Sequence, residues 1–210
     1  ERRIKRLVPA LSVFVLITSI AICLFQSNPY QSLWTGLTSL FGLSNLYLLD
    51  KTTDYFARST ELNVFTHTWS LGVEEQFYFV FPIIVWFSGF SKQTKNSYKN
   101  LFFIMVIFVI PSLIGYIFFY SVNQSATYFL MPFRFWEIGL GSLTFILINR
   151  NLSIIKELEK IPSLIIFLIL ILLMFFPLNL SVTSTILITF LTTILIVAIN
   201  KNSLLFILLN

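Results

Sequence analysis

Apolar runs about as long as a bilayer is thick recur along almost the whole sequence. Hydrophobic residues make up 57% of the chain and charged residues only 11%, which is far from the usage of soluble proteins. A transmembrane helix needs about 20 mostly apolar residues, so we predict an all-α fold, a polytopic bundle of about six or seven membrane segments. The expected segments are residues 8–25, 33–49, 69–88, 101–120, 130–148, 162–178 and 184–199.

Basic residues gather in alternate loops, and this pattern predicts how the chain crosses the membrane. By the positive-inside rule the basic loops are cytoplasmic. For all of them to share one side, only one of the segments 8–25 and 33–49 can cross completely, so 33–49 is expected to be re-entrant or to lie along the outer interface. A net charge of +5 spread over loops does not form the single stripe that nucleic acid needs, so no nucleic-acid partner is expected. The basic loops contain ERRIKR, then Lys92, Lys95 and Lys99, then Arg150, Lys156 and Lys160, and finally Lys201.

Two adjacent carboxylates, Glu74 and Glu75, lie inside the apolar and aromatic run THTWSLGVEEQFYFVFPIIVW, residues 66–86. An ionised side chain at the centre of a bilayer costs about 2.5–3.5 kcal/mol on insertion scales, so charge placed there is a functional candidate. If the run is helical, Ser70, Glu74 and Tyr78 share one face at i, i+4 spacing. The sequence therefore predicts a helix with one polar side.

A second pair of charges, Arg134 and Glu137, lies at i, i+3 spacing inside the run FRFWEIGLGS. The two side chains can pair along one helix face, which lowers the cost of placing either in the membrane. Two interpretations remain open. The pair is either a structural ion pair, with Gly139, Gly141 and Ser142 allowing close helix packing, or part of a functional site.

Three other features also have a plain structural interpretation. The single histidine, His67, stands where a hydrogen-bonded cap or structural residue is more usual than a catalyst. The single cysteine, Cys23, excludes an intramolecular disulfide and a thiolate metal site, and no metal-ligand cluster is found elsewhere. The side chains of Arg2, Arg3, Lys5 and Arg6 can serve as a topological anchor, as a site for the phosphates of a cytosolic ligand, or as both.

Several stretches resemble one known family. HTWSLGVEEQFYFVFP closely resembles the signature of the acyltransferase 3 family, bacterial membrane proteins that O-acylate cell-envelope glycans with a cytosolic acyl-CoA donor. ERRIKRLVPA is similar to the basic segment that precedes a span in that family, and FRFWEIGLGSL to its later arginine and tryptophan-glutamate motif. NLYLLDKTTDYF followed by ELNVFTHTWS is similar to the linker of members that also carry a C-terminal SGNH-type domain. The matches come in the family's order.

The resemblance implies an O-acyltransferase of the bacterial cytoplasmic (inner) membrane. It would transfer an acyl group, most simply acetyl, from acyl-CoA (acetyl-CoA) to a hydroxyl of a cell-envelope polysaccharide, lipopolysaccharide or peptidoglycan, without a metal. The expected partners are the lipid bilayer, acyl-CoA, the glycan acceptor and an SGNH-type domain of the same protein. The resemblance implies catalytic roles for Glu74 and Glu75. It implies substrate-binding roles for Arg2, Arg3, Arg6, His67, Trp69, Ser70, Gln76, Tyr78, Arg134, Trp136 and Glu137.

The family's presumed catalytic histidine lies on a membrane helix that precedes the first matching segment. We therefore expect residues 1–210 to form a partial acyltransferase 3 type domain, cut at its end in a further span, LLFILLN, and inactive by itself. The alternative function is a transporter or flippase that moves a lipid-linked or small substrate past the same charges. The paired repeats typical of such proteins are not found in the sequence. A third alternative is a purely structural membrane subunit, which the two sets of charges inside apolar runs disfavour.

Overall fold

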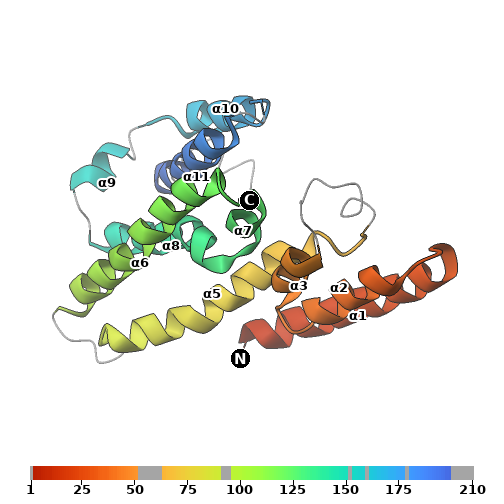
Figure 1. Cartoon of the computed structure of the whole chain (residues 1–210). Coiled ribbons are helices and arrows are strands. Elements are labelled where there is room, and N and C mark those ends of the chain that lie inside the picture. Colours follow the sequence, from red (N-terminus) through yellow and green to blue (C-terminus); the bar gives the residue numbers. More distant parts are fainter. Residues whose placement is uncertain are drawn as a thin grey trace. The chain divides into compact units, whose positions relative to one another are not determined.

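Every element that the computed structural model describes is an α-helix, with no strand among the described residues (Figure 1). The prediction of an all-α fold is therefore confirmed. The helices are α1 (Arg2–Phe25), α2 (Tyr30–Ser39), α3 (Ser44–Lys51), α5 (Thr68–Phe87), α6 (Ser97–Tyr120), α7 (Gln124–Phe129), α8 (Met131–Asn149), α9 (Ser153–Leu158), α10 (Ser163–Leu173) and α11 (Ser181–Ala198). The described residues are 2–51, 63–90, 96–150, 153–158, 161–177 and 180–199.

Within the described ranges of the chain, four helices are long and apolar enough to cross a membrane. They correspond to the segments predicted at 8–25, 101–120, 130–148 and 184–199. The predicted count of six or seven membrane segments is not confirmed. Helix α10 has only 11 residues, and the 20-residue α5 is not among the four. The four candidate spans are Lys5–Phe25, Ser97–Tyr120, Gln124–Asn149 and Ser181–Ala198.

The predicted segment 33–49 is not one continuous helix, because α2 ends in a tight turn before α3 begins. The N–H of Leu43 donates to the carbonyl of Thr38 at 3.0 Å, and the N–H of Gly42 to that of Ser39 at 3.2 Å. Gly42 has φ +66°. This combination is a Schellman motif, in which glycine at the left-handed position stops the helix. The 10 residues of α2 span about 15 Å, half of what a bilayer core requires. A single helical crossing by this segment is therefore excluded.

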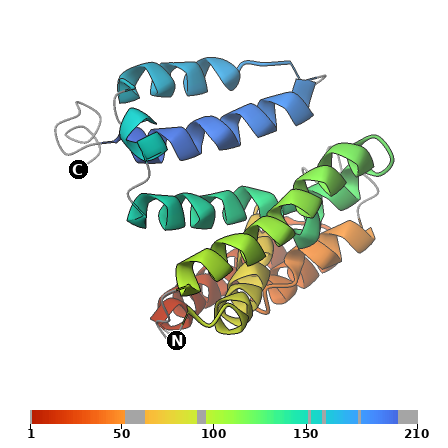
Figure 2. The ribbon, with the colours of Figure 1, turned by 90° about the vertical axis from the view of Figure 1, so that its left-hand side faces the viewer.

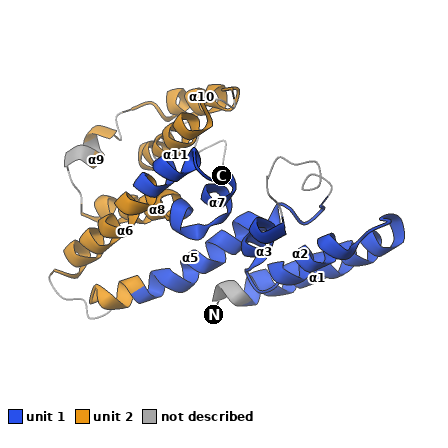
Figure 3. Ribbon diagram, in the orientation of Figure 1, with its two compact units in different colours: residues 1–83, 114–134 blue, residues 84–113, 135–210 orange. Residues whose placement is uncertain are grey.

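The chain divides into two compact units, which are described separately (Figure 3). Unit 1 consists of Glu1–Ile83 and Ile114–Arg134, and unit 2 of Ile84–Leu113 and Phe135–Asn210. The helices α5, α6 and α8 each contribute residues to both units.

In unit 1, the buried face of α2 consists of small residues. They are spaced three and four positions apart in the sequence, so they form one stripe along the helix. The ring of Phe65 lies so close to Gly36 that a Cβ atom there would come within 2.8 Å of it. Phe65 is also part of a core with α1 and makes an edge-to-face contact with Phe14, with ring centroids 5.9 Å apart. The small side chains thus let α1, α2 and the residues before α5 approach closely. The buried residues of α2 are Ser32, Thr35, Gly36 and Ser39.

In unit 2, α6 and α8 are in close contact, and α10 packs against α11 (Figure 2). The backbone N–H of Trp136 donates to the hydroxyl of Ser112 at 3.0 Å. A Cβ atom on Gly139 would come within 2.5 Å of the Val109 side chain. The close packing predicted around Gly139 is therefore observed, whereas Gly141 faces open space.

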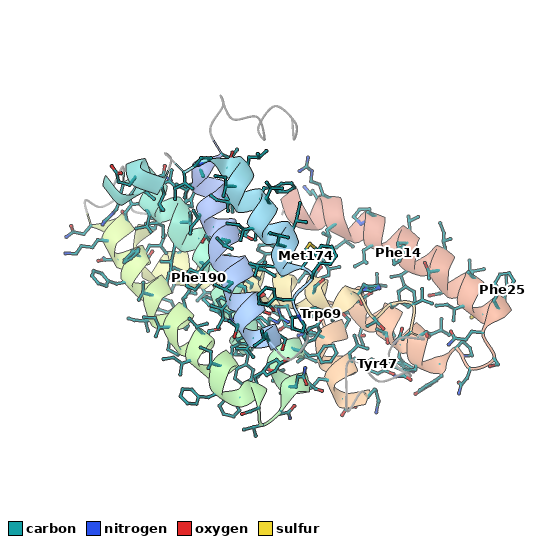
Figure 4. All side chains as sticks on the ribbon, turned by 90° about the horizontal axis from the view of Figure 1, so that it is seen from above. Phe14, Phe25, Tyr47, Trp69, Met174 and Phe190 are labelled. Atoms are coloured by element: carbon teal, nitrogen blue, oxygen red, sulfur yellow. The ribbon has the colours of Figure 1, made fainter. Side chains whose placement is uncertain are left out.

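Large apolar side chains cover the outer faces of the candidate spans. On α1, Phe14 is half exposed and Phe25 is 89% exposed (Figure 4). Met174, just after α10, and Phe190 on α11 are also exposed. Such surfaces are unfavourable in water and suit contact with lipid tails. Together with the four candidate spans they identify a membrane protein.

Candidate functional site

The start of α5 is fixed by a turn that Asn63 organises in unit 1. Its side-chain carbonyl accepts from the N–H of Phe65 at 3.1 Å, and its backbone carbonyl accepts from the N–H and hydroxyl of Thr66 at 3.0 and 2.7 Å. Its side-chain nitrogen donates to the hydroxyl of Thr35 on α2 at 2.7 Å. The first turn of the helix that carries the two carboxylates is therefore tied to α2.

A pair of side-chain amides joins α3 to α5. The Nε2 atom of Gln76 donates to Oδ1 of Asn45 at 2.9 Å, and Nδ2 of Asn45 lies 3.4 Å from Oε1 of Gln76. Gln76 also donates to the carbonyl of Gly42 at 3.2 Å, and Asn45 to the carbonyl of Phe129 at 2.9 Å. Ser44 donates to the carbonyl of Thr68 at 2.7 Å. A partly buried polar network thus connects the α2–α3 turn, α5 and the end of α7.

The two adjacent carboxylates have different surroundings. Glu74 is exposed, whereas Glu75 is half-buried and lies against Gly42. A methyl group on Gly42 would overlap the Oε2 atom of Glu75. Successive residues of a helix point in different directions, which accounts for the difference. Of the two predicted catalytic residues, Glu75 is the one that the fold holds in a defined position.

Arg134, in the first turn of α8, lies against an aromatic pair in unit 1. The guanidinium carbon is 4.7 Å from the centroid of the Tyr128 ring and 5.2 Å from that of Trp69. The centroids of the Trp69 and Tyr128 rings are 4.3 Å apart and the ring planes are inclined by 43°. The ring of Phe129 makes an edge-to-face contact with each of them. A cation over aromatic faces is stabilised by the ring quadrupoles, by about 2 kcal/mol or more when water is excluded. The arginine is thus held by α5 and α7 as well as by its own helix.

The other predicted site residues lie in varied positions. His67 is exposed, and its backbone carbonyl accepts from the hydroxyl of Ser70 at 3.3 Å. Trp136 is fully buried and belongs to unit 2, as does the partly exposed Glu137. Pairing of Glu137 with Arg134 stays a prediction. Tyr78 is partly buried on α5, Arg6 is exposed on α1, and the side chains of Arg2 and Arg3 lie outside the described residues.

Four residues that shape this region do not stand out in the sequence as site residues. Asn45 is fully buried, Gly42 holds the turn beside Glu75, and Tyr128 and Phe129 complete the aromatic cluster. One signal was present for the turn. Gly42 is followed by Ser44 and Asn45, and glycine after a helix followed by Ser or Asn is typical of a helix stop and a new start. No comparable local signal in the sequence indicates that Tyr128 and Phe129 belong to this region.

The arrangement in unit 1 has the chemistry of a polar site. No group of three or more His, Cys, Asp or Glu side chains that could hold a metal is found among the described residues. A half-buried carboxylate can accept or orient a proton, and a fixed guanidinium can stabilise developing negative charge. The fold and this region together define a helical membrane protein with an acidic and a basic group on neighbouring elements.

Comparisons with known proteins connect this chain to O-acetyltransferases. It is 34% identical over 172 residues to an uncharacterized protein of Haemophilus influenzae, which covers 76% of this chain and 65% of that protein. It is 28% identical over 144 residues to O-acetyltransferase OatA of Staphylococcus aureus, which covers 68% of this chain and 23% of that protein. A putative O-acetyltransferase of the same species is 33% identical over 143 residues, 67% of this chain and 23% of that protein.

The similarity therefore covers most of this chain but less than two thirds of each relative. No family model matches the chain, and no solved structure matches it. About two thirds of this chain is therefore similar to proteins named O-acetyltransferase.

Proposed function

We propose that this chain is part of a membrane O-acyltransferase of the acyltransferase 3 family that moves an acyl group, most simply acetyl, from cytosolic acyl-CoA to a hydroxyl of a cell-envelope glycan. The observation that carries the proposal is the similarity to proteins named O-acetyltransferase, at 28% and 33% identity. The motifs around Glu75 and Arg134 support it, because they are the stretches that resemble that family. The inner membrane and an SGNH-type domain in the complete protein are parts of the same proposal.

The proposed reaction is a simple acyl transfer. The acceptor hydroxyl oxygen attacks the thioester carbonyl, the new carbon–oxygen bond forms, and the carbon–sulfur bond breaks. The proton of the hydroxyl leaves with the coenzyme A thiolate, which departs as the thiol. Glu75 orients or relays this proton, and Arg134 stabilises the oxyanion that develops on the carbonyl. The basic side chains Arg2, Arg3 and Arg6 bind the phosphates of coenzyme A.

The proposal is tested with membranes that contain the complete gene product, labelled acetyl-CoA and envelope glycan. The expected result is label bound covalently to the glycan and release of one coenzyme A thiol for each acyl group transferred. The control is the same protein with Glu75→Gln. Label should then stay in the donor although the variant is inserted in the membrane.

The competing transporter function predicts the opposite outcome. If a panel of acyl donors gives neither labelled glycan nor free thiol, while the inserted protein moves a lipid-linked or small substrate unchanged across the membrane, the transferase proposal is wrong. A covalent change in the acceptor that depends on the donor excludes transport as the sole function.

A further inference from the structure

Gly42 is the point at which the α2–α3 turn meets the Glu75 side chain. Its φ of +66° is one that residues with a side chain rarely adopt. A Cβ atom there would also lie 3.1 Å from the Cβ of Glu75 and would overlap its carboxylate. One other glycine in the described part of the chain, Gly89, has a positive φ, +69°, and its Cβ position faces open space. Two constraints therefore favour glycine at position 42: the positive φ of its backbone and the lack of room for a side chain beside Glu75.

Gln76, the next residue of α5, holds the same turn from the other side. Its Nε2 atom donates to the carbonyl of Gly42 and to the side chain of Asn45. Asn45 in turn donates to the carbonyl of Phe129. Gly72, one turn earlier on α5, leaves room for this approach, because a Cβ there would lie 2.7 Å from Oδ1 of Asn45. The turn cannot move relative to Glu75 without breaking these hydrogen bonds.

The donors of this amide pair are used within the fold. A side-chain amide has two N–H groups. Those of Gln76 point to Gly42 and Asn45, and those of Asn45 point to Phe129 and Gln76. Gln76 is therefore unsuited to donate to a substrate, although the family resemblance implies a substrate-binding role for it. The contacts of Gln76 suit a residue that positions its neighbours and does not itself touch the substrate.

We propose that Gly42, Asn45 and Gln76 are positioning residues that hold the Glu75 carboxylate in place for acyl transfer. The inference rests on the proposed function, in which Glu75 handles the proton of the acceptor hydroxyl. The Gly42 turn packs against one side of the Glu75 side chain. The hydrogen bonds of the Asn45–Gln76 pair keep this turn at a fixed distance from α5. Misplacing a reacting group by about 1 Å can lower a rate roughly a hundredfold.

The first test compares two glycine variants in the complete protein. Gly42→Ala lowers kcat roughly a hundredfold with an unchanged KM for acyl-CoA, because the methyl group displaces the carboxylate. Gly89→Ala introduces a similar backbone strain without this overlap and keeps kcat. In a Glu75→Asp background the carboxylate is one methylene shorter, so Gly42→Ala costs much less activity than it does beside glutamate. An equal loss in both backgrounds overturns the proposal.

The second test does not depend on activity. A water-soluble carbodiimide with an amine labels exposed carboxylates, and the exposed Glu74 serves as an internal standard for Glu75. In purified, membrane-inserted protein, Gln76→Ala and Gly42→Ala raise the ratio of Glu75 to Glu74 labelling measured by mass spectrometry, whereas Gly89→Ala does not. If Gly42→Ala is not recovered in the membrane, Gln76→Ala decides the result.

The two tests separate the inference from the function on which it rests. An unchanged labelling ratio in Gln76→Ala overturns the positioning role, whether or not the protein transfers acyl groups. A raised ratio in a protein whose unaltered form transfers no acyl group from any donor overturns the proposed function and leaves the hold on Glu75 supported.

Discussion

Asn45 and Gln76, 31 positions apart in the chain, face each other through their side-chain amides and join α3 to α5. Each amide also donates to a backbone carbonyl, that of Phe129 for Asn45 and that of Gly42 for Gln76. Removing one partner from such a buried network leaves the others without a donor or acceptor, which is costlier than the hydrogen bond itself is worth.

Asn45→Leu should therefore destabilise the protein by about 1–3 kcal/mol, because the carbonyl of Phe129 and the amide of Gln76 each lose their hydrogen bond with Asn45. Unfolding in detergent with increasing denaturant measures the change. Adding Gln76→Leu should cost less than the sum of the two single substitutions, since both remove the same contact. Strict additivity would contradict the pairing.

Gly36→Ala should destabilise by about 1–3 kcal/mol, because the new methyl group would come within 2.8 Å of the buried Phe65 ring. Gly141→Ala is the matched control. It also lies inside a helix, but its Cβ position faces open space. The control should be neutral or should stabilise by up to about 1 kcal/mol, as expected for alanine replacing glycine in a helix. Equal thermal midpoints for the two variants would show that Phe65 can move aside.

The helices around these residues could largely be predicted from the sequence. The run predicted as a helix at 69–88 is helical in α5 (Thr68–Phe87), and four of the predicted segments are long and apolar enough to span. Apolar runs of this length report on helix formation directly, because every backbone polar group must be satisfied within the segment. The segment 162–178 was predicted too long, since α10 ends at Leu173.

The arrangement of the candidate site could be predicted only in part. Glu75 and Arg134 stand out in the sequence because charge is rare in apolar runs. Their surroundings depend on contacts between residues far apart, such as the 84 positions that separate Asn45 from Phe129. Neither periodicity nor composition carries that information. For the same reason, nothing local distinguishes the exposed Glu74 from Glu75, which packs against a turn more than 30 positions earlier.

Trp69→Leu should destabilise unit 1 by about 1–2 kcal/mol, because Arg134 would lose one of its two aromatic neighbours. Trp69→Phe keeps a ring at this position and should cost less. Trp86→Leu, at a side chain that is 66% exposed on the same helix, is the control and should have little effect. Unfolding in detergent compares the three. If Trp69→Leu behaves like Trp86→Leu, the stacking of Arg134 adds nothing to stability.

Glu75→Gln in the complete protein should lower acyl transfer by roughly 10²–10⁴-fold, the usual contribution of a group that handles a proton in the transition state. Glutamine has the same size and keeps the contact with Gly42, so insertion and stability should change little. Glu74→Gln removes a charge from an exposed side chain and should have the smaller effect. Glu157→Gln, at an exposed residue on α9, controls for the loss of a negative charge elsewhere.

Transfer of labelled acetyl to glycan is compared at equal amounts of inserted protein. Full activity of Glu75→Gln would remove Glu75 from the reaction, and a larger loss in Glu74→Gln than in Glu75→Gln would mean that the exposed carboxylate is the one that handles the proton.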